Sequence, residues 1–391
     1  MSESFVSFRK SSQTLKDDMR QNRILLFIFD ATGLGHLRRM ARIANELGAF
    51  AVLVVTGMDE AEWIVPSSCE VLRLPRLAGG RSLFKKGDRT WSGLSSAEAA
   101  RIRRRALQAA FEDFRPDAVL VDYLPFGKCE ELFDVLSGCR ALKYFILRGI
   151  VDAADYGVLS GSATDAIASV YDRILVACDA RIVDVAREYA FTAAAADKIC
   201  YVGYVAPIPQ ARSLARTARG VHDSQKWVVC SVGGGRGAAD LPRRCAELAA
   251  QLPTVLFDVV YGPHSELAEI PAGAPQNCRI SRERRDLPDL HAAADVVVSG
   301  GGYNSIIEAA IGGARVLVWP SRAQDDEQYI QARRLGAYHP IRLLGSIDEL
   351  SSALVCELAG DSGFPVLGNM IDCNGAHRIR DILISDLSAS R

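Results

Sequence analysis

Short hydrophobic runs, rich in branched side chains, alternate along this chain with longer segments in which apolar residues recur every three or four positions. The short runs are typical of buried strands, and the first half of the chain holds seven of them, at residues 24–29, 51–55, 71–74, 118–121, 142–147, 173–177 and 198–202. Helical spacing marks intervening segments such as residues 37–47 and 97–114. Strands that alternate with helices form parallel sheets with right-handed crossovers, so the pattern predicts an α/β protein.

The same pattern begins again after a polar interval. Residues 205–226 contain Pro207, Pro209 and Gly220 among several Arg and Ser residues, which is typical of an interdomain linker. Five further strands are predicted beyond it, at residues 227–231, 255–260, 277–280, 296–299 and 315–319. The expected organisation is two doubly wound Rossmann-like domains, with segments at residues 1–22 (polar tail), 23–204 (first domain), 205–226 (linker), 227–370 (second domain) and 371–391 (a C-terminal helix packing back on the first domain).

Composition excludes some classes of protein. The chain has 391 residues, of which 49% are apolar and 24% charged, which is enough for two or three domains with full cores. A formal net charge of −1 argues against a general attraction to nucleic acid. The polar N-terminus predicts no signal peptide, and no window approaches the roughly 20 apolar residues of a membrane span. Ten cysteines without C-x-x-C or zinc spacing are expected to be mostly buried thiols of a cytoplasmic protein.

The first glycine-rich turn carries a candidate base. Residues 30–36 read D-A-T-G-L-G-H, so the first strand ends, two glycines turn the chain, and His36 opens a helix. A histidine with an ordinary pKa of about 6.5 can accept a proton from a hydroxyl near neutral pH. The alternative is that His36 only caps the helix or packs at its start. A nicotinamide role is discounted, because G-x-G-x-x-G requires glycine where Arg38 stands.

Two acids compete to orient that histidine. Asp122 follows the strand at residues 118–121, and Asp30 follows the first strand, so both are expected at the same edge of the sheet. A carboxylate hydrogen-bonded to a histidine base holds its tautomer, as in catalytic triads. Either acid could instead cap a loop.

Two glycine-rich turns in the second half predict an anion site. Each follows a predicted strand and leads to a helix, where free backbone N–H groups can cradle a diphosphate without a metal. The candidate residues in these turns are Gly233, Gly234, Gly235, Arg236, Gly237, Gly301, Gly302, Asn304 and Ser305. The alternative for the first turn is a flexible loop without a ligand.

Acidic and amide side chains follow the second turn. Glu308 lies one to two turns into the helix, on the face that could reach a ribose diol. Asp326, Glu327 and Gln328 follow the strand at residues 315–319, at the edge where open α/β sheets bind ligands. No Asp-x-Asp motif that would hold Mg²⁺ follows a predicted strand.

These motifs, in this order, resemble the sugar-nucleotide half of GT-B glycosyltransferases. The nearest resemblance is to inverting enzymes related to the peptidoglycan lipid-intermediate N-acetylglucosaminyltransferase, and it is specific in residues 233–238 and 295–335. Residues 117–127 and 147–152 look more like a group of predicted bacterial glycosyltransferases. The chain departs from the peptidoglycan enzymes by having Gly300–Gly301 where an arginine precedes a serine–glycine pair, and Gln331 where asparagine often follows the D-x-Q.

The resemblance implies a function. It implies a first domain for the acceptor and a second for the nucleotide sugar, facing across a cleft, with His36 as general base and Asp326, Glu327 and Gln328 on the donor sugar. The implied reaction is inverting, metal-independent transfer of a hexose or N-acetylhexosamine from a UDP-sugar to a small-molecule, saccharide or lipid-linked acceptor, without a cofactor. The alternatives are a nucleotide-sugar hydrolase or epimerase and a catalytically silent nucleotide-binding module. A basic run at residues 101–105 either contacts an anionic membrane surface or forms a solvated helix face.

Overall fold

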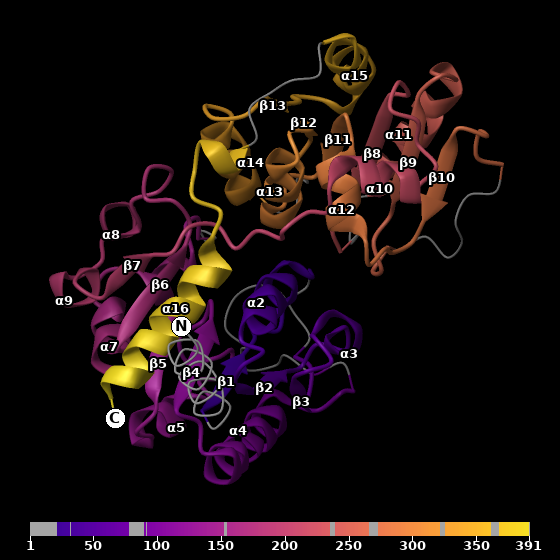
Figure 1. Ribbon diagram of the computed structural model, residues 1–391. Coiled ribbons are helices and arrows are strands. Elements are labelled where there is room, and N and C mark those ends of the chain that lie inside the picture. Colours follow the sequence, from indigo (N-terminus) through magenta and orange to yellow (C-terminus); the bar gives the residue numbers. More distant parts are fainter. Residues whose placement is uncertain are drawn as a thin grey trace, which may run out of the picture.

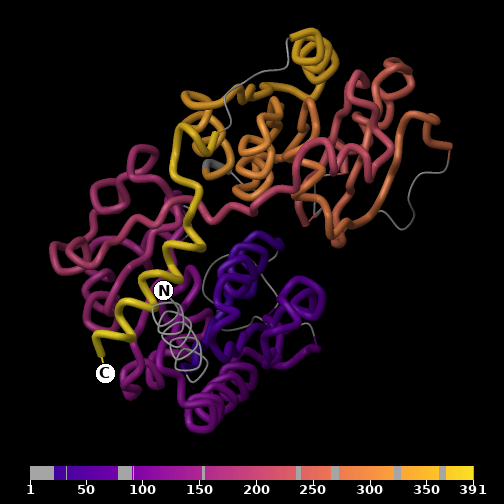
Figure 2. Tube along the Cα trace, in the orientation of Figure 1, coloured from indigo at the N-terminus to yellow at the C-terminus, as the bar shows by residue number. Residues whose placement is uncertain are grey.

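The computed structural model describes residues 22–31, 33–77, 90, 92–151, 155–234, 239–265, 273–320, 325–360 and 367–390. They form two α/β domains, each built on one parallel sheet with helices on both sides (Figure 1). The two-domain parallel architecture predicted from the sequence is therefore confirmed. Figure 2 shows the chain crossing between the domains twice, once after β7 and again before the C-terminal helix.

The first sheet has seven strands in the order β3-β2-β1-β4-β5-β6-β7. Their bounds are β1 (Arg23–Phe27), β2 (Ala51–Thr56), β3 (Glu70–Arg73), β4 (Ala118–Asp122), β5 (Leu142–Arg148), β6 (Arg173–Ala177) and β7 (Ile199–Tyr201). The helices of this domain are α2 (Gly35–Glu46), α3 (Ala61–Ile64), α4 (Ser96–Phe114), α5 (Phe133–Gly138), α6 (Tyr156–Leu159), α7 (Ala163–Val170), α8 (Val185–Glu188) and α9 (Ala193–Ala196).

The second sheet has six strands in the order β10-β9-β8-β11-β12-β13. Their bounds are β8 (Trp227–Ser231), β9 (Leu256–Val260), β10 (Cys278–Ser281), β11 (Val296–Ser299), β12 (Arg315–Val318) and β13 (Ile341–Leu343). The helices are α10 (Arg212–Ala218), α11 (Asp240–Gln251), α12 (Leu287–Ala293), α13 (Tyr303–Ile311), α14 (Asp325–Leu335), α15 (Leu350–Ala359) and α16 (Gly375–Ala389), with 3-10 turns at Ile347–Glu349 and Leu367–Asn369.

The central strands are apolar without interruption because both of their faces are covered. All residues of β4, β8 and β11 are buried, as expected for parallel strands between two helical layers. β1 pairs in parallel with β4, and β8 with β11, so the carboxyl ends of each pair meet at one edge. The glycine-rich turns leave the sheets at these edges.

The segment after the second domain returns to the first. Ile379, Leu383 and Leu387 lie on one face of α16 and join a core cluster with residues of β1 and α2. Arg173 of β6 pairs with Asp386 of α16 at 2.7 Å. Figure 1 shows α16, in yellow, lying along the first domain.

Three details differ from the expectations. Within residues 205–226, α10 packs against α12 of the second domain, where Arg212 pairs with Asp295 at 2.7 Å. Strand β13 was missed, because it is only three residues long and none of them is buried. The prediction that most cysteines are buried is wrong. Four are buried, Cys178, Cys230, Cys245 and Cys278, whereas five are partly exposed and Cys356 lies on the exposed face of α15.

Candidate active site

His36 lies at the start of α2, where the carboxyl end of β1 turns into the helix. Its Nδ1 lies 2.8 Å from Oδ2 of Asp122, the last residue of β4. The guanidinium of Arg39, one helical turn after His36, donates to the other oxygen of Asp122 at 2.5 Å. All three side chains are nearly buried. The carboxylate is therefore shared between the imidazole and an arginine.

This arrangement determines the tautomer of the imidazole. Nδ1 of His36 lies 2.8 Å from the Asp122 carboxylate, which only accepts hydrogen bonds, and 3.1 Å from Nη2 of Arg39, which only donates. The shorter contact favours the proton on Nδ1. With the proton on Nδ1, Nε2 is the unprotonated nitrogen, and none of the described residues forms a hydrogen bond with it. His36 lines a cavity between the domains.

Burial and charge keep the pair in this state. Burial lowers the pKa of His36 to about 4, although Asp122 opposes the shift. Burial alone would raise the pKa of Asp122, but the charges and hydrogen bonds of His36 and Arg39 hold it well below its usual range. Neutral imidazole and ionised carboxylate therefore coexist at neutral pH.

Aromatic rings fix the plane of the imidazole. The ring of Phe29 meets it edge-on at a centroid distance of 5.1 Å, and that of Tyr123 at 4.8 Å. Arg148, at the end of β5, lies over the Tyr123 ring at 4.7 Å. The imidazole is thus held by packing as well as by Asp122.

Asp30 has other partners. It accepts a hydrogen bond from the backbone N–H of Gly57 at 2.8 Å and another from Arg103 of α4 at 2.7 Å. Arg103 is 1% exposed and also donates to Glu131 at 2.8 Å. In this structure the acid that contacts His36 is Asp122, whereas Asp30 belongs to a buried ion cluster.

The cavity at His36 is bounded by turns from both domains. It has a volume of about 180 Å³ and is lined from the second domain by Gly233 and Gly234 after β8 and by Gly300, Gly302 and Ser305 at the start of α13. Gly301 has a φ of +89°, and a Cβ there would lie 2.9 Å from a methyl group of Val318. The two predicted anion-binding turns therefore reach the same cavity as His36.

Helix α13 places two predicted contacts beside α2. Asn304 donates to the carbonyl of Gly35 at 3.1 Å and accepts from Arg42 at 2.9 Å. Glu308 lines the cavity, forms an ion pair with Arg42, and accepts from His291 at 2.8 Å. Burial raises the pKa of Glu308, but Arg42 and His291 outweigh it and lower the value to about 2. This carboxylate is ionised and joins the two domains.

The D-E-Q segment forms the first turn of α14 and also lines the cavity. Glu327 pairs with Arg148 across the domain boundary at 2.5 Å. Gln328 lines the cavity next to Gly301, where an added Cβ would lie 3.1 Å from the Cβ of Gln328. The side chain of Asp326 and the whole of Gly235, Arg236 and Gly237 lie outside the described residues.

The described part of the chain shows neither a metal cluster nor a membrane-spanning helix. There, no three His, Cys, Asp or Glu side chains are grouped to hold a metal ion, and no helix is long and apolar enough to cross a membrane. In the basic run of α4, Arg101, Arg104 and Arg105 are exposed, whereas Arg103 faces inward to Asp30.

Sequence reasoning missed three arginines of the site: Arg39, Arg42 and Arg148. Arg39 lies three residues after His36, a spacing that puts both side chains on one helix face, so it could have been found. The charge of Arg148 at a carboxyl strand end was a weaker signal. Nothing local marks Arg42, because its partners Asn304 and Glu308 lie in the other domain.

Comparison with known proteins extends the fold assignment. No family model and no curated protein matches the chain. Among solved structures, it is similar to the glycotransferase of kitacinnamycin, with a TM-score of 0.63 and 17% identity over 94% of this chain and 99% of that one. It is also similar to UGT2 of Phytolacca americana complexed with UDP-2fluoro-glucose and pterostilbene. The TM-score is 0.59, with 16% identity over 93% of this chain and 94% of that one.

A structure of a different activity is also similar. The UDP-GlcNAc 2-epimerase of Neisseria meningitidis, bound to UDP-GlcNAc, has a TM-score of 0.61 and 15% identity over 93% of this chain and 100% of that one. At such identities the likeness shows the fold, and this is the GT-B fold of two Rossmann-like domains facing across a cleft.

Proposed function

We propose that this chain is a cytoplasmic glycosyltransferase that moves a sugar from a UDP-sugar to a small-molecule acceptor, with inversion and without a metal. The observation that carries the proposal is the His36–Asp122 pair, which lies at a cavity bounded by two glycine-rich turns. A base opposite an anion cradle is the arrangement that sugar transfer from a diphosphate requires. The similar structures that carry UDP-sugars, and the resemblance of residues 295–335 to the peptidoglycan transferases, support it.

The proposed step balances in atoms and charge. An acceptor hydroxyl gives its proton to Nε2 of His36, and its oxygen forms a bond to the anomeric carbon as the bond from that carbon to the diphosphate breaks. The electron pair leaves with the diphosphate. Backbone N–H groups at Gly302 and Ser305 and the positive end of α13 stabilise its charge, while Asp122 stabilises the imidazolium.

The size of the cavity adds a requirement for opening. Ligand pockets measure about 300–1,000 Å³, so 180 Å³ is too small for a nucleotide sugar. Two ion pairs, Arg42–Glu308 and Arg148–Glu327, cross between the domains beside this cavity. We infer that the domains separate at these pairs when the donor binds. Glu308 can still accept ribose hydroxyls, because a carboxylate has about four acceptor positions and two are occupied.

The test is UDP release by the purified protein. UDP-glucose and UDP-N-acetylglucosamine are each incubated with and without a panel of phenolic, amine and sugar acceptors, and products are separated by liquid chromatography. Acceptor-dependent release with a glycosylated product of inverted configuration supports the proposal. Release without an acceptor indicates a hydrolase, isomerised nucleotide sugar indicates an epimerase, and UDP binding without turnover indicates a silent module.

A further inference from the structure

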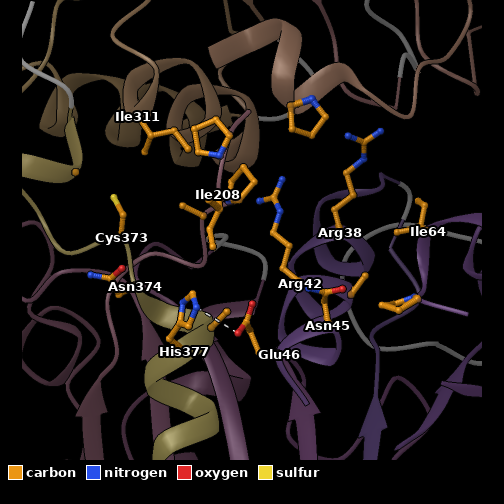
Figure 3. A pocket seen from close by; sticks show the side chains of 18 of the residues that line it. Arg38, Arg42, Asn45, Glu46, Ile64, Ile208, Ile311, Cys373, Asn374 and His377 are labelled. Atoms are coloured by element: carbon orange, nitrogen blue, oxygen red, sulfur yellow. Dashed lines mark ion pairs between the residues drawn. The ribbon is translucent and has the colours of Figure 1, made fainter. Parts of the chain in front are cut away.

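A second and larger cavity lies at the hinge. It has a volume of about 610 Å³ and is bounded by α2, the segment at residues 206–209, the start of α12 and the start of α16. Arg42 faces this cavity, whereas its partner Glu308 faces the cavity at His36. Arg38 lines both. Figure 3 shows Arg38 and Arg42 projecting from α2, with Ile208 and Ile311 near the Arg42 side.

Two arginines at this cavity have no side-chain partner among the residues that the structure describes. Arg38 comes from α2 of the first domain and Arg285 from the loop before α12 of the second. Neither forms a hydrogen bond or an ion pair through its side chain with any residue that the structure describes. Burial lowers the pKa of Arg38, which is the consequence of desolvating a cation that has no direct counter-ion.

Arg42, the third arginine at this cavity, is already bound by protein groups. Arg42 donates to the carbonyl of Val205 at 3.2 Å and to Asn304 at 2.9 Å, and it pairs with Glu308. Its side chain is 14% exposed, so it forms a fixed wall of the cavity. The charge available to a ligand is therefore that of Arg38 and Arg285.

The carboxylates nearby do not balance these charges. Glu46 at the cavity is already bound by His377 and Arg380, each at 3.3 Å. Glu308, the carboxylate with the larger effect on Arg38, is already bound by Arg42 and His291. Glu283 is exposed and, in the described part of the chain, forms no ion pair with Arg38. The cavity thus keeps an excess of positive charge, which favours an anion.

Part of the remaining lining is apolar. Trp63, Ile64, Ile208 and Ile311 contribute to it, together with several prolines, and Asn45, Asn374 and His377 are polar members of the lining. Ile208 is 77% exposed, a large apolar surface left open to water beside the arginines. A ligand that covered this surface would gain from burying it, at roughly 25 cal/mol per Å².

We propose that the hinge cavity binds a phosphate monoester that carries an aromatic or apolar group, with the phosphate held by Arg38 and Arg285 and the apolar group against Ile208 and Trp63. A dianion with three acceptor oxygens matches two guanidinium groups better than a single carboxylate does. The diphosphate cradle lies at the other cavity, and Arg38 is the one described lining residue that the two cavities share.

Isothermal titration with phenyl phosphate tests this assignment. We expect one site per chain that persists in saturating UDP, with inorganic phosphate binding more weakly because it lacks the ring, and benzoate more weakly because it lacks the second charge. Arg38→Met and Arg285→Met should each weaken binding by about tenfold or more. The matched control is Arg187→Met, an exposed arginine of α8 that lines neither cavity.

Several results would overturn it. These are no binding of phenyl phosphate, displacement by UDP, equal affinity for benzoate, or wild-type affinity in both arginine variants. Because Arg285 is exposed, Arg285→Met and Arg285→Glu carry the test if Arg38→Met does not fold. His36→Ala should bind phenyl phosphate like the wild type, so a chain without transferase activity would leave this result unaffected.

Discussion

The ion cluster beneath the first glycine turn offers the most direct test of how the site is assembled. Arg103 reaches Asp30 at 2.7 Å, Glu131 at 2.7 Å and the carbonyl of Pro75 at 2.9 Å. Its side chain and those of both acids are at most 1% exposed. Arg103→Met keeps most of the volume but leaves buried Glu131 without the cation that it contacts, and leaves buried Asp30, among the described residues, with only the neighbouring charge of Lys128.

The size of the expected loss in unfolding free energy depends on the hydrogen bonds that Asp30 and Glu131 keep in Arg103→Met. Asp30 keeps the N–H of Gly57 at 2.8 Å, and Glu131 keeps that of Cys129 at 2.7 Å. Removing one partner from a buried ion pair costs about 3–5 kcal/mol of unfolding free energy. With a urea m-value of about 3 kcal/mol/M, the unfolding midpoint of the first domain should fall by about 1–1.7 M.

The assay is urea unfolding, with hydrogen exchange at β1 and β4 to identify the transition of the first domain. Arg104→Met is the matched control, because Arg104 is exposed and makes one hydrogen bond, to the carbonyl of Cys129 at 3.0 Å. It should change the unfolding free energy by less than about 0.5 kcal/mol. Adding Asp30→Asn and Glu131→Gln to Arg103→Met should restore part of the loss. A deficit below about 1 kcal/mol for Arg103→Met would refute the cluster as a structural anchor.

Three predictions concern the cavity at His36. His36→Ala should lower the rate of transfer by about 10²–10⁴-fold and keep the affinity for UDP. The rate of the wild-type protein should fall only below about pH 4, because a His36 pKa near 4 leaves the imidazole neutral above that pH. Wild-type turnover in the variant, or an acidic limb of the pH profile near pH 6.5, would contradict this. Glu308→Ala should weaken UDP binding about 10- to 100-fold by calorimetry, whereas Arg42→Met, which breaks the same ion pair, should not. Gln328→Ala should change the preference between UDP-sugars in steady-state kinetics and leave UDP affinity unchanged; an equal loss for UDP would assign Gln328 to the nucleotide or the fold.

The fold could be predicted because its signal is local. The apolar runs of β4 and β11 are buried on both faces, and a strand with that environment needs an uninterrupted hydrophobic sequence. β13 carries no such signal, since an edge strand of three residues has little to bury. Helix α10, within the predicted linker, was missed because part of what holds it is not visible in the local sequence. Its residues Arg212 and Arg216 form ion pairs with Asp295, which is distant in the sequence.

The candidate site was predictable to the extent that it depends on sheet edges. Glycine turns after β8 and β11 must come together, because the two strands are parallel neighbours, and His36 must lie at the corresponding edge of the other sheet. The contacts that join the domains have no such signal. Arg42 and Glu308 are 266 residues apart, and their pairing depends on how the two domains face each other.

The different environments of Asp30 and Asp122 show where the sequence alone could not decide. Both follow neighbouring parallel strands at one edge, so strand pattern gives them equal claims on His36. The difference lies in the helices: α4 brings Arg103 over Asp30, whereas α2 brings Arg39 and His36 together over Asp122. Asp30 is held by Arg103 and by the N–H of Gly57, so it does not contact the imidazole. Asp122 shares its two oxygens between Arg39 and His36 and therefore orients the imidazole. Which acid orients His36 therefore depends on how the helices pack, because the helices determine the side-chain partners of Asp30 and Asp122.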